Sequence, residues 1–316
     1  TNLGQLANAH ELIKTGDDDP TITVKGHVRV VVGAALKDSI ASVNKILAKI
    51  RSVQGTVTVT SEVDAPLPAL SYVTGDVFLN AQKGKAAIAT DKLLTVDGNL
   101  HLDGLTGAIS LPALGSVGTI QITEYTDKAT VTSLDIAGMT AGTVQTAAGQ
   151  LTLPNATSVS LGGTLPALVK LLKCTAFTLT TGGTQTDLEL LLGGKAATLS
   201  LGVTKMTGTT SITTSGNIDL PSVTEVATMT LTFTEDSSEL SLPSLTKING
   251  AVPADAAGFT TNDKCVVVDL SALKTSLATM TLPGVTGLTL TALTSQTQPI
   301  NAVKATVFDA PALSVK

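Results

Sequence analysis

Four side chains in the first third of the sequence carry functional groups suited to ligand recognition. Asn99, His101 and Asp103 alternate with two leucines, and Phe78 precedes them. Alternate residues of a β-strand project from the same face, so the three polar groups should share one exposed surface. An imidazole beside a carboxylate can bind a metal or transfer protons, and an aromatic ring beside amides can hold a sugar or a peptide.

The spacing of the neighbouring segments refines this expectation. If each repeat adds one strand to a sheet, Phe78 lies beside His101 and the two rings stack. We therefore predict a ligand-binding patch made of Phe78, Asn99, His101 and Asp103. The same residues also fit an ordinary solvated sheet face, and this alternative stays open.

No motif in the sequence specifies a catalytic centre. There is no glycine-rich phosphate loop, zinc-ligand pair or nucleophile elbow, so we predict no catalytic residue, no metal and no cofactor. The alternative to a non-enzymatic protein is a carbohydrate-active β-helix enzyme. Such enzymes use clustered carboxylates and aromatic platforms, whereas this chain has two tyrosines and no tryptophan.

The composition excludes other classes of protein. Of 316 residues, 43% are hydrophobic and 14% are charged, so the chain can bury a core and is not disordered. A net charge of -5 and a pI near 5.2 argue against a nucleic-acid partner. Aromatic residues make up only 2%, which suits a narrow core of small aliphatic side chains.

A short phrase built around a Leu-Pro step recurs along the chain. Its spacing is often one or two multiples of about 21 residues, as in solenoid repeats. Proline belongs where a strand ends and the chain turns. The phrase occurs at Leu67-Pro68, Leu111-Pro112, Leu153-Pro154, Leu165-Pro166, Leu220-Pro221, Leu242-Pro243, Leu282-Pro283 and Ala310-Pro311.

Pairs of aliphatic residues at alternate positions recur with similar spacing. We expect each pair to point inward from one strand, and Val77, Leu100 and Ile120 to stack in a single file. The pairs are Val57/Val59, Val77/Leu79, Leu100/Leu102, Ile120/Ile122, Leu134/Ile136, Val159/Leu161, Phe177/Leu179, Leu199/Leu201, Met229/Leu231, Val266/Val268 and Leu288/Leu290. The fold predicted is mainly β, an elongated right-handed β-solenoid of parallel strands.

The segment from Leu67 to Leu79 combines Leu-Pro-Ala-Leu, a valine, a glycine and an alternating strand. In this it resembles the coils of leucine-rich-repeat-like and receptor-L-domain-like solenoids of bacterial cell surfaces. The resemblance covers most of the chain after Gly55, although the asparagine ladder of ordinary leucine-rich repeats is absent. It implies adhesion or protein binding on an exported scaffold, and no catalytic residues to transfer.

The predicted organisation is a cap followed by repeats. Residues 1–54 form the cap, with a strand near 27–32 and a helix over 38–51 that places Leu47 and Ile50 on one face. Residues 55–316 form one continuous solenoid.

Threonines alternate with apolar residues at 56–60, 228–234 and 289–291. Such rows resemble ice-binding surfaces, but the strands around Phe78 and His101 interrupt them. We interpret the threonines as strand-forming residues that keep the exposed face soluble, and keep an ice-binding or structural spacer as an alternative.

The predicted function is a non-enzymatic interaction or adhesion module that binds an unidentified protein or glycan. The start at Thr1 suggests export to a bacterial surface, and an upstream lipid anchor is left open. We expect no transmembrane segment, because no apolar run is long enough.

Cys174 and Cys265 are far apart in sequence, and we expect two buried free thiols.

Overall fold

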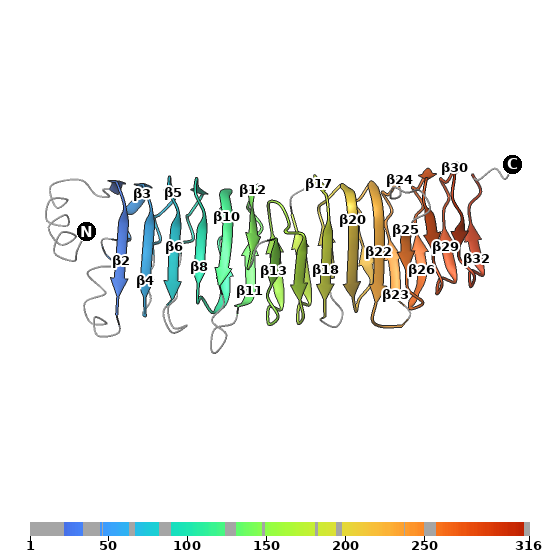
Figure 1. The fold of residues 1–316 in the computed structure, drawn as a ribbon, viewed down its shortest axis with the longest axis horizontal. Coiled ribbons are helices and arrows are strands. Elements are labelled where there is room, and N and C mark those ends of the chain that lie inside the picture. The colour runs from blue at the N-terminus through green and yellow to red at the C-terminus, as the bar shows by residue number, and fades with distance from the viewer. Residues whose placement is uncertain are drawn as a thin grey trace. The chain divides into compact units, whose positions relative to one another are not determined.

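The chain is mainly β, with short parallel strands that stack as turns of a β-solenoid (Figure 1). The structure is a computed structural model. It describes residues 22–33, 45, 47–62, 67–81, 90–123, 131–146, 149–180, 183–193, 198–236, 238–249 and 257–312. Its contacts divide the chain into unit 1, Thr1–Ala148 with Gly162–Thr164, and unit 2, Gly149–Leu161 with Leu165–Lys316.

Each coil of unit 1 contributes two neighbouring legs to a first sheet. One leg carries β1, β3, β5 and β7, and the other carries β2, β4, β6 and β8. Strand β10 belongs to both, because its start pairs with β7 and its end with β8, and β12 pairs with β10. A second sheet contains β9 and β11. The strands are β1 (Ile22–Lys25), β2 (Val28–Val32), β3 (Ile50–Gln54), β4 (Val57–Ser61), β5 (Tyr72–Val73), β6 (Val77–Ala81), β7 (Thr95–Val96), β8 (Leu100–Asp103), β9 (Gly107–Ser110), β10 (Ser116–Thr123), β11 (Val131–Ile136) and β12 (Ala141–Gln145).

The expected file of aliphatic side chains is confirmed. Val77 pairs in register with Leu100, and Leu100 with Ile120. All three are buried. The steps of 23 and 20 residues between these partners agree with the repeat seen in the sequence. Burial of these aliphatic groups is the main favourable term holding successive coils together.

The aliphatic pairs do not form one file along the chain. Leu134 lies in β11, which pairs with β9 and not with the strands around Ile120. Each coil has more than one β side, and more than one of these sides can bury an alternating pair, so spacing alone does not assign a pair to a side. The predicted pair Val266/Val268 is also wrong in part: a register shift buries Cys265 with Val268 and leaves Val266 half-buried.

The recurring Leu-Pro step forms a tight turn with a buried residue at each end. At Leu67–Leu70, the N–H of Leu70 donates to the carbonyl oxygen of Leu67 at 3.1 Å, and both leucines are buried. Proline occupies the second turn position, where its fixed φ is favourable. The same bond closes the turns at 111–114, 220–223 and 242–245.

Glycines stack in a column at the corner between the two legs of unit 1. A Cβ on Gly98 would lie 2.8 Å from the carbonyl carbon of Gly75, and one on Gly75 would lie 2.9 Å from that of Gly55. Those distances are shorter than normal contacts between Cβ atoms and backbone, so only glycine allows the coils to approach this closely.

Unit 2 repeats this plan. Its first sheet has one leg through β17, β24, β27 and β30 and another through β13, β15, β18, β25, β28 and β31, and the long β20 and β22 serve both. The strands of this sheet are β13 (Gln150–Thr152), β15 (Leu168–Leu171), β17 (Thr184–Gln185), β18 (Leu188–Leu192), β20 (Lys205–Thr214), β22 (Glu225–Phe233), β24 (Lys247–Ile248), β25 (Ala257–Thr261), β27 (Thr275–Ser276), β28 (Thr279–Thr281), β30 (Ser295–Gln296) and β31 (Ile300–Asn301).

Further sides of the unit 2 coils belong to two other groups of strands. One contains β14 (Ser158–Leu161), β16 (Ala176–Leu179) and β19 (Thr198–Leu201). The other contains β21 (Ile218–Asp219), β23 (Ser238–Ser241), β26 (Cys265–Asp269), β29 (Gly287–Thr289) and β32 (Val307–Asp309). Phe177, Phe233 and Phe259 are fully buried among the aliphatic side chains.

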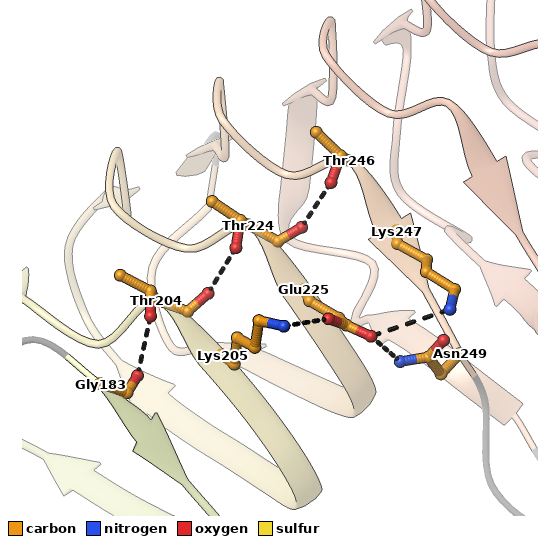
Figure 2. A network of polar contacts seen from close by, with 8 residues as sticks. All are labelled: Gly183, Thr204, Lys205, Thr224, Glu225, Thr246, Lys247 and Asn249. Atoms are coloured by element: carbon orange, nitrogen blue, oxygen red, sulfur yellow. Dashed lines mark hydrogen bonds and ion pairs between the residues drawn. The ribbon is translucent and has the colours of Figure 1, made fainter.

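A ladder of threonines joins successive coils of unit 2 (Figure 2). The hydroxyl of Thr224 donates to the carbonyl oxygen of Thr204 at 2.9 Å, and that of Thr246 donates to Thr224 at 3.0 Å. The ladder begins with Thr204, which donates to the carbonyl of Gly183 at 3.0 Å. Each of these threonines directly follows a buried corner residue, so their spacing follows the coil.

The predicted N-terminal helix is not shown. Residues 38–44 and 46 lie outside the described residues, and Ile50 and Arg51 begin strand β3. The predicted strand near 27–32 is confirmed as β2, Val28–Val32. Since β1, β2 and β3 pair within the first sheet, stacked strands already occur within the residues assigned to the cap. The division into a cap and one continuous repeat region stays a prediction.

Both cysteines are buried and free, as expected. Burial raises the pKa of the Cys174 thiol, and raises that of Cys265 to about 12. Each thiol donates to a backbone carbonyl two residues further on. Among the described residues there is no helix of the length and apolarity needed to cross a membrane.

Candidate functional site

The predicted patch lies on the outward side of the second leg of unit 1. The residues in register with Phe78 form a row across six strands: Arg29, Thr58, Phe78, His101, Gln121 and Gln145. A second row contains Val31, Thr60, Asn80, Asp103 and Thr123. We call these two rows the outer face of unit 1. Buried aliphatic residues alternate with them along each strand, so the backbone fixes which groups point outward.

Phe78 and His101 stack at the centre of this face. Their ring centroids are 4.4 Å apart and the ring planes differ by 8°. Both side chains are half-buried. The predicted stacking of Phe78 on His101 is therefore confirmed. Because each ring covers a face of the other, a ligand approaching from solvent meets ring edges, including polar atoms of the imidazole.

Two glutamines extend the row beyond His101. The amide nitrogen of Gln145 donates to the side-chain oxygen of Gln121 at 3.0 Å, and the amide nitrogen of Gln121 donates to the carbonyl oxygen of Thr146 at 2.7 Å. These bonds hold both amides in one orientation. Such fixed amides lose little side-chain entropy when a ligand binds.

Asn80 and Asp103 stand beside each other in the second row. The side-chain oxygen of Asn80 is buried and has no hydrogen-bond partner within the described residues. An unpaired buried acceptor is destabilising by about 1–3 kcal/mol. The carboxylate of Asp103 lies beside this unpaired amide oxygen, so this part of the face is rich in acceptors and favours a ligand rich in hydrogen-bond donors.

Asn99 has a structural role at the corner before β8. Its side-chain oxygen accepts the N–H of Thr119 at 3.0 Å, and its own N–H donates to the carboxylate of Asp76 at 2.8 Å. Three coils earlier His27 makes a similar contact, in which its Nδ1 accepts the N–H of Thr56. A short ladder of acceptor side chains thus exists here, although no consensus asparagine ladder is present in the sequence. These bonds help to hold the coils in register, and the predicted binding role of Asn99 stays a prediction.

The outer face has no metal cluster. Among the described residues, no group of three or more His, Cys, Asp or Glu side chains could hold a metal ion. His101 and Asp103 are two residues apart on one strand, and no described hydrogen bond joins them. The side chains of this face can therefore donate and accept hydrogen bonds and offer ring edges.

Sequence reasoning missed part of the row. The predicted patch did not include Gln145, which lies 24 residues after Gln121 on β12. No aliphatic pair comparable to the others marks β12, because only Val144 of that strand is buried. The spacing of the two glutamines is the signal that could have found it.

A separate polar cluster on unit 2 was also missed. Glu225 accepts a hydrogen bond from the side chain of Asn249 at 2.5 Å and forms an ion pair with Lys205 at 3.1 Å (Figure 2). The bond from Asn249, followed by that from Lys205, lowers the pKa of the Glu225 carboxyl. Lys205 is exposed, whereas Glu225 and Asn249 are half-buried. These contacts join three coils, and we expect them to contribute modestly to stability.

Comparisons with protein-family models, curated proteins and solved structures found no match for this chain. The resemblance to leucine-rich-repeat-like and receptor-L-domain-like solenoids therefore stays a prediction.

Proposed function

We propose that the chain is a non-enzymatic binding module whose outer face of unit 1 binds an extended glycan. The observation that carries the proposal is the Phe78–His101 stack at the centre of an in-register row of amides and hydroxyls. Repeating polar groups at the strand spacing of about 4.8 Å suit a polymer that crosses the strands. The ring edges and the neighbouring amides contact successive sugar rings.

The chemistry of the face favours a glycan over a protein. The core of a protein interface is usually apolar and rich in aromatic residues. Here the large apolar side chains of the two rows are Val31 and Phe78, and hydroxyls and amides make up most of the rest. Asn80 and Asp103 lie side by side and carry acceptor oxygens, which are complementary to the hydroxyl donors of a sugar.

The test is binding of the full chain to a glycan array, followed by calorimetry with the strongest oligosaccharide. Phe78→Ala removes half of the stack, and we expect affinity to fall at least tenfold. His101→Phe preserves the ring stacking but removes the imidazole nitrogens. Its affinity therefore separates the contribution of stacking from that of hydrogen bonds to the imidazole. Lys92→Ala changes an exposed turn residue of unit 1 outside the two rows and serves as the matched control.

Retention of full affinity by a folded Phe78→Ala protein would contradict the proposed site. Binding of proteins or peptides but no glycan would contradict the ligand class. Thermal melts of each variant show whether a lost signal reflects unfolding.

We further propose that the protein is exported and displayed at a bacterial cell surface. We also propose that its solenoid is right-handed and of the leucine-rich-repeat or L-domain type. Coil steps of 20 to 23 residues and the repeated leucine turn support that fold type. An adhesion role requires an external location, which fractionation and surface labelling of cells producing the protein would test.

A further inference from the structure

A second surface, on unit 2, carries a regular array of hydroxyl groups. It is the outward side of β20, β22, β25 and β28. In register across these strands lie Ser211, Thr230, Thr260 and Thr281. Thr213 and Thr232 form a second row beside them on β20 and β22. We call these six residues the hydroxyl face. Its first row continues over four coils of unit 2, and its second row over two, whereas Phe78 and His101 interrupt the threonines of unit 1.

The hydroxyls of this face are free to meet a ligand. None of the six side-chain hydroxyls forms a hydrogen bond within the described part of the chain, in contrast to those of Thr224 and Thr246 in the ladder. Thr230 is exposed, and the other five are half-buried by their neighbours in the rows. Ile212 and Leu231 lie buried beneath them and fix the strands that carry the array.

The residues of the array are spaced almost evenly in both directions. Neighbouring strands are about 4.8 Å apart, and alternate residues along a strand are about 6.6 Å apart. Threonine is stiff at χ1, so its methyl and hydroxyl groups keep their positions when they meet a surface. Hydroxyl groups at fixed positions in such an array can pair with many oxygen atoms of a ligand at once only if those atoms repeat with a similar spacing.

The chemistry of the face excludes most other ligands. It contains no cationic side chain for nucleic acid and no aromatic ring for a sugar or a protein interface. A small molecule needs a concave pocket, which a row of short side chains on a sheet does not provide. Ice offers a periodic lattice of oxygen atoms that such an evenly spaced array requires. The threonine methyl groups favour release of disordered water from the face when it meets the ice surface.

We propose that the hydroxyl face binds ice. The proposal is independent of the glycan site, because it uses other residues in the other unit. The test measures partitioning of the full chain into slowly growing ice, and the shape of ice crystals in its presence. Thr230→Tyr places a bulky side chain in the middle of the array. Ser241→Tyr introduces the same bulk at a half-buried position of β23, outside the array, as the matched control.

We expect the natural protein and Ser241→Tyr to enter the ice fraction and to shape crystals, and Thr230→Tyr to lose at least nine-tenths of this partitioning with an unchanged melting temperature of the protein. Exclusion of the natural protein from ice would overturn the proposal. Equal partitioning of folded Thr230→Tyr would also overturn it, as would binding to insoluble polysaccharide without partitioning into ice.

Discussion

Thr224 donates its hydroxyl hydrogen to the carbonyl oxygen of Thr204, which lies one coil earlier in the chain. The same carbonyl also accepts the backbone N–H of Thr224 at 2.8 Å. Thr224 thus donates twice to one carbonyl oxygen of the preceding coil, and Thr246 donates twice to that of Thr224 in the same way. The corner is held by paired hydrogen bonds in addition to the packed core.

Removing one rung of this ladder should weaken the fold moderately. Thr224→Val keeps the shape of the side chain but deletes its donor, and we expect a loss of about 1 kcal/mol in the free energy of unfolding. Denaturant titration measures it. Thr281→Val removes an outward hydroxyl that has no described partner and should change stability by much less. Equal losses in the two variants would show that the ladder bond itself contributes nothing.

The glycine column should tolerate no side chain. Gly98→Ala would place a Cβ 2.5 Å from a carboxylate oxygen of Asp76 and 2.8 Å from the backbone of Gly75. We expect a loss of about 1–3 kcal/mol and a lower melting temperature. Gly115→Ala is the matched control, since its Cβ would meet its nearest neighbour at 3.6 Å. A Gly98→Ala protein as stable as Gly115→Ala would contradict the close approach of the coils.

Both thiols should be inert in the folded protein. The reactive species is the thiolate, and burial holds the pKa of Cys265 at about 12 and raises that of Cys174. We expect modification by a thiol reagent at neutral pH to follow unfolding and to yield two thiols per chain only in denaturant. Rapid modification of either cysteine in the native protein would contradict their burial.

Stability should depend on pH through Glu225. Its partners lower the pKa of the carboxyl in the folded state, so the unfolded state binds the proton more readily. The stabilisation is therefore present above the ordinary value of 4.5 and is lost as the pH falls through the folded-state pKa. We expect the stability difference between the natural protein and Glu225→Gln to shrink on acidification.

Asn249→Ala removes the largest cause of that shift and should reduce the pH dependence. Denaturation curves at several pH values between about 3 and 6 measure the effect. A stability difference that is constant over this range would show that the carboxyl has the same pKa folded and unfolded.

The parts of the fold that depend on alternation and spacing were predictable from the sequence. The 23 residues between Phe78 and His101 match the length of one coil, and the structure stacks these rings. The Leu-Pro phrase predicted a turn, and the bond from Leu70 to Leu67 closes one. Both signals are local, and each survives because the coils stack in parallel without large shifts in register.

Other features depend on contacts that no short pattern encodes. Ile120 and Leu134 both begin an alternating aliphatic pair, but they belong to different sheets. Asn99 was predicted as a binding residue because its amide alternates with His101, and that role stays a prediction; the bond from the N–H of Thr119 in the next coil was not predictable from a local pattern. Ile50 fits a helical spacing, but pairing with β1 places it in a strand.

The register of the outer face is the central claim of this account, because every surface assignment in unit 1 depends on it. The most direct test is nuclear Overhauser contact between the ring protons of Phe78 and those of His101 in the isotopically labelled full chain. Stacked rings with centroids 4.4 Å apart predict strong cross-peaks between the two side chains. Complete assignment of both rings with no cross-peak between them would contradict the register and the binding face built on it.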